Sequence, residues 1–279
     1  MKLLKILVLF LSSLASGCSI IQGSKLLIPE SFNLTPISPT VYVEVGTDKE
    51  IREQLLVAME KAENAIRKAY GSVKSHPIIH ACVSEGCYES FGGRGSKAKV
   101  YGNRILLSPR GLNWHFLAHE WSHSEIQSRL TFSAWWSLPQ WFNEGVAVVV
   151  SEAPEHSETH WNYLVTSNIS RPSQKELYEL KSLRQWLDAV EHYGATQNAN
   201  RRANGESEVR PLYTAAGIEV RPWLSKTGSQ GLLAVIESLN NGEEFDSVYL
   251  AANKSLIRIG IKTRLPVNST IEAVEKPQK

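Results

Sequence analysis

The stretch HEWSH at residues 119–123 decides the expected fold, and it lies inside a segment whose spacing predicts a helix over 113–128. Four residues advance a helix by about 400° and about 6 Å, so His119 and His123 leave it on one face, one turn apart, and can bind a single metal ion. Glu120 lies beside this face, where its carboxylate can reach a water on the ion without being a ligand. The alternative is a helix that carries two surface histidines by coincidence.

A second stretch, WFNEGVA at residues 141–147, opens a helix predicted over 139–152. A tetrahedral catalytic zinc takes three protein ligands and keeps its fourth position for water, and two histidines with one glutamate are a recurrent set. Glu144 follows His123 by 21 positions, on a helix close enough in sequence to pack against the first. We therefore expect Glu144 to be the third ligand; a solvated helix carboxylate is the alternative.

Together the two motifs resemble those of the gluzincin metallopeptidases, in which H-E-x-x-H is followed about twenty residues later by N-E on the next helix. The N-E-G-x-A form is most similar to the aminopeptidase branch and to the small peptidase MA-like domains. The resemblance implies one Zn²⁺ per chain, held by His119, His123 and Glu144. It also implies hydrolysis of a peptide or protein substrate, with Glu120 as the general base.

The same resemblance implies a donor for the oxyanion that develops during hydrolysis. Tyr213 opens a YTAAG stretch, 69 residues after Glu144, that is similar to a family helix whose tyrosine donates this hydrogen bond. A tyrosine packed at a helix interface is the alternative. His156 and His160 are rival donors, and His115 is interpreted as a neighbour of the ligands or as a bystander, but not as a ligand.

Similarity to the family is close over residues 99–150 and looser over 41–255. The segment 99–107, expected to be the substrate-binding strand, lacks a G-x-M-E-N element for gripping a free N-terminus. Aminopeptidase specificity is therefore not implied. No carboxylate follows Glu144 by four residues as in thermolysin-like enzymes, so the sequence does not identify the partner that orients a histidine ligand.

The N-terminal sequence MKLLKILVLFLSSLASGC predicts export. A basic start precedes an apolar run over 6–14, which is far shorter than the roughly 20 residues that a bilayer-crossing helix needs. The ending LASGC resembles a bacterial lipobox, which implies that residues 1–17 are a lipoprotein signal peptide and that Cys18 is lipidated and anchors the protein to a membrane. Ser19 is similar to outer-membrane sorting, facing the periplasm. An ordinary cleaved signal with an incidental cysteine is the alternative.

Composition sets further limits on the function. The 279 residues, 42% hydrophobic and 21% charged, are typical of a folded protein. Because 30 basic residues nearly balance 28 acidic ones, a nucleic-acid binder that relies on strong electrostatic attraction is disfavoured. In an exported protein Cys82 and Cys87 are predicted to form a disulfide, with two buried free thiols as the alternative. The oligomeric state is not predicted.

These inferences predict an α+β, zincin-like fold, in which a small N-terminal sheet lobe with helices precedes a helical C-terminal lobe and the zinc site lies between them. Residues 18–40 contain three prolines and are interpreted as a tether from lipidated Cys18. The peptidase domain is expected over 41–262, and a tail follows it. The boundaries of its two lobes and of the tail are 41–128, 129–262 and 263–279.

In the first lobe we expect strands at 41–45, 78–83 and 99–107. Its long helix is predicted to begin with a capping box of Thr47 and Glu50 and to end at Gly71. In the second lobe we expect further helices at 173–190, 212–225, 229–240 and 243–252.

The connection over 153–211 is predicted to be a wall or lid over the cleft, and its polar part at 194–208 a surface loop. Trp161, Tyr163 and Trp186 are predicted substrate contacts within it. Core packing is the alternative for Trp186, which continues the apolar face of its helix.

Three functions are compatible with the sequence. The first is a membrane-anchored zinc peptidase. The second is a catalytically inactive envelope lipoprotein that uses a zincin-like cleft as a binding module. The third is a structural envelope protein whose H-E-x-x-H is coincidental. Metal content separates the third from the others, and loss of cleavage in a Glu120→Gln variant separates the first from the second.

Overall fold

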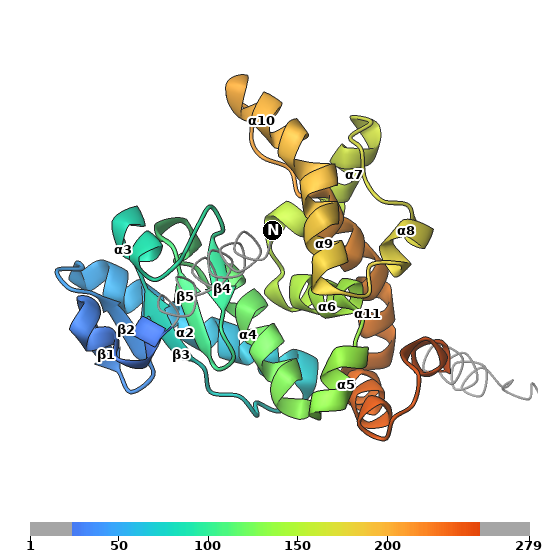
Figure 1. Ribbon diagram of the computed structural model, residues 1–279, viewed down its shortest axis with the longest axis horizontal. Helices are drawn as coiled ribbons and strands as arrows, with labels where there is room; N and C mark the ends of the chain where they lie inside the picture. Colours follow the sequence, from blue (N-terminus) through green and yellow to red (C-terminus); the bar gives the residue numbers. More distant parts are fainter. Residues whose placement is uncertain (1–23, 252–279) are drawn as a thin grey trace, which may run out of the picture.

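The computed structural model describes residues 24–251 of the chain. A small sheet lobe and a larger helical lobe lie side by side (Figure 1). The mixed α+β class is therefore as predicted, with the sheet in the first part of the chain and helices after it. The predicted signal peptide at 1–17, Cys18 and the tail at 263–279 lie outside the described residues.

Within residues 24–251 the strands form one five-stranded sheet in the order β1-β2-β3-β5-β4. These strands are β1 (Leu34–Ser38), β2 (Val41–Glu44), β3 (Ile78–Ala81), β4 (Ala98–Val100) and β5 (Arg104–Leu107). The central strands β2, β3 and β5 run parallel, whereas the edges β1 and β4 are antiparallel to their neighbours. Val41 and Val43 of β2 are buried and alternate with half-buried residues, as the pattern predicts.

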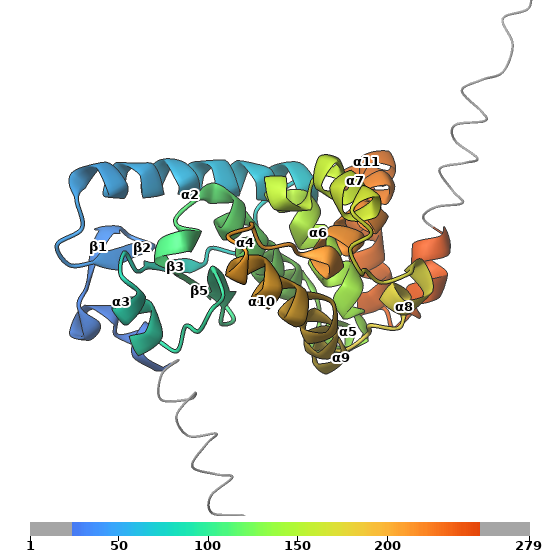
Figure 2. The same ribbon diagram turned by 90° about the horizontal axis from the view of Figure 1, so that it is seen from above.

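Helix α2 (Lys49–Tyr70) runs along one side of the molecule, over both lobes (Figure 2). Its apolar residues recur at helical spacing and face the core, where it buries Leu55, Ala58, Ala62, Ile66 and Tyr70. The helix ends, as predicted, at Gly71, whose left-handed φ of 73° suits a residue without a Cβ.

The start of α2 differs from the prediction. Asp48 is the N-cap residue, and no side chain caps the helix. The Thr47 hydroxyl instead donates to the carbonyl oxygen of Glu44 at 2.6 Å. Thr47 thus closes the turn after β2, so the predicted capping box with Glu50 does not form.

The remaining helices are α3 (Glu85–Ser90), α4 (Trp114–Arg129), α5 (Phe132–Ser137), α6 (Gln140–Ser151), α7 (Glu158–Thr166), α8 (Gln174–Tyr178), α9 (Leu183–Val190), α10 (Thr196–Ala203) and α11 (Pro211–Asn240). Short 3₁₀ turns are η1 (Lys25–Leu27), η2 (Pro29–Phe32), η3 (Pro109–Gly111) and η4 (Pro154–His156), and η5 (Glu191–Ala195) is a π-helix. Residues 245–251 are also helical. The sequence does not predict α3, α5 and α7, since six to nine residues carry little periodicity.

The predicted tether over 18–40 is wrong for its described part. Leu26 and Leu34 are buried in a small core with Tyr88 and Phe91, and β1 pairs with β2. The prolines that suggested a tether fit the folded segment, because Pro29 begins η2 and Pro36 lies in an edge strand.

The predicted strand at 99–107 is a hairpin of two strands, β4 and β5. Tyr101 and Arg104 exchange both backbone hydrogen bonds, at 2.8 and 3.1 Å, around a two-residue turn in which Gly102 has a φ of 59°. The Gly-Asn pair is a turn signal that the apolar residues on either side obscure.

Two predictions in the helical lobe also change, and a third is confirmed. The helix expected at 173–190 is two helices, α8 and α9, each with its own capping box. The expected loop at 194–208 contains the end of η5 and α10, because the buried Asn198 amide pairs with both backbone groups of Val209. The two helices predicted at 212–225 and 229–240 are both present within α11, and the chain kinks between them at Gly228, whose backbone is not helical.

Candidate metal centre

Helix α4 supplies both histidines of the H-E-x-x-H motif. The side chain of Asn113 accepts hydrogen bonds from the backbone N–H groups of His115 and Phe116 and so begins the helix. One turn apart, His119 and His123 point their Nε2 atoms at each other, 3.3 Å apart. The predicted common face therefore forms.

Helix α6 brings the third predicted ligand to the same point. The Glu144 Oε2 atom lies 3.3 Å from the Nε2 atom of His119 and 3.6 Å from that of His123. Zinc–ligand distances of about 2.0–2.1 Å in a tetrahedral site place neighbouring ligand atoms about 3.4 Å apart. The three atoms thus have the spacing of three corners around one cation, and the cluster can hold a metal ion.

The hydrogen bonds of Glu144 also fit a ligand. Its Oε1 atom accepts from the Gln140 side chain at 2.9 Å, one turn earlier on α6. Its buried Oε2 atom has no hydrogen-bond partner among the described residues, although it faces both histidines. A buried acceptor of this kind is costly unless a proton or a cation satisfies it.

Charges within the cluster stabilise one another. Burial disfavours both the Glu144 carboxylate and the protonated His123 imidazole, but the attraction between these two charges is stronger. It lowers the pKa of Glu144 and raises that of His123 to about 9. In the absence of a metal, the protonated His123 imidazole supplies the positive charge that faces Glu144. A metal ion that binds here displaces this proton.

A partner that sequence analysis did not identify orients His123. The Nδ1 atom of His123 lies 3.1 Å from the Oδ1 atom of Asn143, which is buried and directly precedes Glu144. An amide oxygen can only accept, so Nδ1 carries the proton and Nε2 keeps its lone pair for a metal. Asn143 belongs to the N-E motif, but no local pattern in the sequence indicates which side chain it contacts.

Close packing of α6 against α11 places Glu144. A Cβ atom on Gly145 would lie 2.5 Å from the side chain of Val220 and 2.7 Å from the carbonyl oxygen of Ala216. One on Gly217 would lie 2.4 Å from the side chain of Val148. The glycine of the N-E-G motif is therefore required by helix packing.

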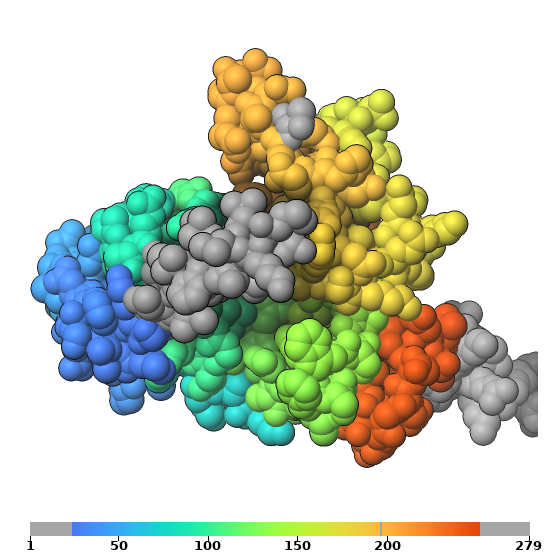
Figure 3. All heavy atoms as spheres, in the orientation of Figure 1, coloured from blue at the N-terminus to red at the C-terminus, as the bar shows by residue number. Residues whose placement is uncertain are grey.

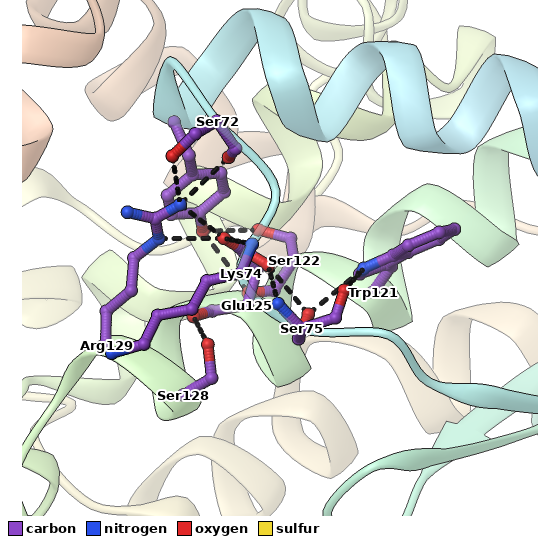
Figure 4. Close-up of polar contacts among 9 residues, drawn as sticks. Ser72, Lys74, Ser75, Trp121, Ser122, Glu125, Ser128 and Arg129 are labelled. Carbon is purple, nitrogen blue, oxygen red and sulfur yellow. Dashed lines mark hydrogen bonds and ion pairs between the residues drawn. The ribbon is translucent and has the colours of Figure 1, made fainter.

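On its other face α4 is tied to the segment between α2 and β3 through the fully buried Glu125 (Figure 4). This carboxylate accepts from the backbone N–H groups of Lys74 and Ser75, at 2.8 and 2.7 Å, and from the Ser75 hydroxyl.

Arg129, one turn after Glu125 on α4, forms an ion pair with it and also donates to the carbonyl oxygen of Ser72. Trp121 donates to the Ser75 hydroxyl at 3.1 Å. The i, i+4 spacing of Glu125 and Arg129 was the available signal for this network.

Beside the metal cluster lies a cavity of about 120 Å³, with His119, Glu120 and Tyr213 in its wall. The remaining lining residues are Ser96, Lys97, Ala98, Phe116, Glu155, His156 and Arg210. Burial raises the pKa of Glu120, against the opposing effect of the two histidines. Glu120, which is predicted to act as a base, therefore lines this cavity beside His119.

Of the three predicted oxyanion donors, Tyr213 has a ring contact with His119 of the cluster. Its ring centre is 6.1 Å from that of His119, and burial keeps its pKa above the ordinary value, so the hydroxyl stays protonated. His156 stacks on the Tyr213 ring, with ring centres 5.8 Å apart, and lines the same cavity. His160 is instead a neighbour of Tyr163 on α7.

His115 does not join the cluster. Its Nδ1 atom lies 2.7 Å from the carbonyl oxygen of Ser151, which ties α4 to the end of α6. This contact leaves open whether His115 neighbours the ligands or is a bystander.

Part of the connection at 153–211 does form a wall of the cavity, through Glu155, His156 and Arg210. Trp186 is buried and packs edge-on against Tyr213. Its position therefore agrees with core packing, the alternative to a substrate contact. Trp161 stacks with the guanidinium of Arg171.

Cys82 and Cys87 are joined by a disulfide, with their Cα atoms 5.4 Å apart. The bond spans the turn from β3 into α3, which the Ser84 side chain caps. Among residues 24–251 no helix combines the length and the apolar character that crossing a bilayer requires.

No protein-family model matches the chain, and searches of curated proteins and of solved structures found no similar protein. The function is therefore argued from the geometry of the site.

Proposed function

We propose that the chain is a membrane-anchored, zinc-dependent peptidase with a zincin-like fold and the zinc site between its lobes. The supporting observation is the triangle formed by the Nε2 atoms of His119 and His123 and the Oε2 atom of Glu144. Its edges of 3.3, 3.3 and 3.6 Å match a tetrahedral zinc site. The lipobox at Cys18 supplies the anchor, at the outer membrane and facing the periplasm.

Zn²⁺ at this site supplies a water of lowered pKa and polarises a substrate carbonyl. The Glu120 carboxylate accepts the proton of the attacking water and passes it to the departing amine nitrogen, a role commonly worth about 10²- to 10⁴-fold in rate. Its raised pKa suits both steps, because a more basic carboxylate accepts a proton readily near neutral pH and can still return it. This position of Glu120 favours the peptidase over the inactive binding module.

Tyr213 donates its hydroxyl hydrogen to the oxyanion that forms at the substrate carbonyl. The protonated state of this hydroxyl and its place in the cavity wall support the role. His156, stacked against the ring, holds it in place.

Metal content tests the ligand set. The purified protein should hold one zinc per chain, and His119→Ala and Glu144→Ala variants should lose it. His160→Ala is the matched control, since this histidine lies on α7 outside the cluster, and it should keep the metal. Zinc retained at full occupancy in His119→Ala would refute the assignment.

A digest of a diverse peptide pool tests the reaction. The zinc-loaded protein should cleave it, chelator should stop cleavage, and Glu120→Gln should lower the rate by about 10²-fold or more while keeping zinc. Glu158→Gln, an exposed carboxylate variant, should cleave normally. Unchanged cleavage by Glu120→Gln contradicts the mechanism, and a zinc-loaded protein that cleaves nothing supports the binding module instead.

A further inference from the structure

Two helices of the second lobe expose large apolar side chains at i, i+4 spacing. On α5, Phe132 is 81% exposed and Trp136 is 73% exposed, with ring centres 6.1 Å apart. On α9, Leu183 and Leu187 are each more than half exposed. An exposed pair of large aromatic side chains such as Phe132 and Trp136 is a candidate for an interaction surface.

The beginning of the described chain carries a similar pair. Leu27 and Ile28, at the end of η1, are each more than half exposed, although Leu26 beside them is buried. We call these six residues the apolar face: Leu27, Ile28, Phe132, Trp136, Leu183 and Leu187.

The elements of the apolar face lie on one side of the molecule. In Figure 2 the dark blue N-terminal segment, α5 and α9 lie along the lower side, whereas α2 lies along the upper side. The space-filling view from the front shows α5 in green at the surface, next to the orange-red end of α11 (Figure 3).

The short distance along the chain to Cys18 indicates what covers this face. Because η1 begins the fold at Lys25, only seven positions separate it from Cys18, and an extended chain spans at most about 25 Å over that distance. A lipid on Cys18 therefore keeps the N-terminal side of the fold close to the bilayer surface. The expected longer tether would not have imposed this limit.

We propose that the apolar face docks on the membrane surface, with Phe132 and Trp136 inserted at the level of the lipid headgroups. Trp and Phe side chains are favoured at this depth, and an apolar helix face there buries about 5–10 Å into the boundary. A lipid chain and a docked face together make a stronger attachment than the lipid alone. The proposal rests on the anchor at Cys18, which is part of the proposed function.

Lipid-attached quenchers test the orientation on the full-length protein, matured in a bacterial host and reconstituted in vesicles. Because Cys82 and Cys87 are disulfide-bonded and the sulfur of an acylated Cys18 is a thioether, a Ser133→Cys variant of the acylated chain provides one free thiol, on α5, for a fluorescent label and leaves both aromatic residues in place. Glu53→Cys on α2 is the matched control on the opposite side. Headgroup-level nitroxide lipids should quench the label at 133 several-fold more than the label at 53.

A Phe132→Ser, Trp136→Ser double variant should remove most of that difference, with an unchanged thermal unfolding temperature showing that the fold is intact. Equal quenching at the two positions would overturn the proposal. So would a dimer in detergent that the double variant abolishes, since a second copy would then cover the face.

The intact mass of the purified chain separates this proposal from the anchor itself. A chain with unmodified Cys18 overturns both. An acylated chain with equal quenching overturns only the docking, and neither result depends on zinc or on peptidase activity.

Discussion

At the scale of single residues, the hydrogen bond from His123 to Asn143 controls which imidazole nitrogen faces the cluster. Asn143→Ala should weaken zinc binding about 10- to 100-fold, because nothing then holds the ring and its tautomer. Asn143→Asp should bind nearly as well as the original, since a carboxylate also accepts from Nδ1. Competition with a chromogenic chelator measures both affinities. Equal affinities of all three proteins would show that Asn143 does not position the ligand.

His80 makes a separate prediction about pH. It is fully buried, with Nε2 at 3.0 Å from the carbonyl oxygen of Leu26 and no partner for Nδ1 within the described part of the chain. Burial lowers its pKa to about 4, from 6.5 in the unfolded chain. Below pH 6.5 the unfolded state therefore binds a proton that the folded state does not, and stability is lost as the pH falls towards 4.

At pH 5 this difference costs about 2 kcal/mol of the free energy of unfolding. Urea unfolding at pH 7 and pH 5 should show it as a larger loss for the original protein than for His80→Gln, which does not titrate. The other histidines are present in both proteins, so their effect on the pH dependence of the free energy of unfolding is the same in each. The same pH dependence in both would mean that His80 is not the group responsible.

At the scale of elements, the contact of α6 with α11 sets the position of Glu144. Gly145→Ala should lower the free energy of unfolding by about 1–3 kcal/mol, because the added methyl group meets the backbone of Ala216 and the helices must separate. Zinc affinity should fall as well, since Glu144 is the neighbouring residue.

The matched control is Gly86→Ala in α3, where an added Cβ meets nothing within 4 Å. It should be neutral or slightly stabilising, as expected for alanine in a helix. Chemical denaturation measures the free energy of unfolding of both variants, and zinc titration measures their zinc affinity. A Gly145→Ala protein as stable as the control would show that the packing is looser than described.

At the scale of the whole molecule, the cluster connects two helices that have different packing partners. Helix α4 contacts the sheet through β4 and β5, whereas α6 contacts α11. A metal that binds only the folded state at 100 times its dissociation constant stabilises it by about 2.7 kcal/mol. Zinc should therefore raise the unfolding temperature, chelator should reverse the effect, and His119→Ala should show no shift. An equal shift in that variant would place the stabilising metal elsewhere.

Much of the candidate site was predictable because its signals are local. The i, i+4 spacing of His119 and His123 determines a shared face in any α-helix, and an acid 21 positions later on a second helix is within reach. The α+β class follows in the same way from segment periodicity. The tetrahedral spacing of the three ligand atoms agrees with this prediction.

The sequence by itself therefore determined which three residues form the cluster and the class of the fold, since helical periodicity needs no distant partner. Tertiary structure alone decided that residues 25–38 join the sheet lobe, that Asn143 orients His123 and that Tyr213 lies beside His119. Each of these depends on contacts between segments far apart in the chain or on the exact rotation of packed helices. Pairings of that kind arise only when the whole core closes, and no local pattern encodes them.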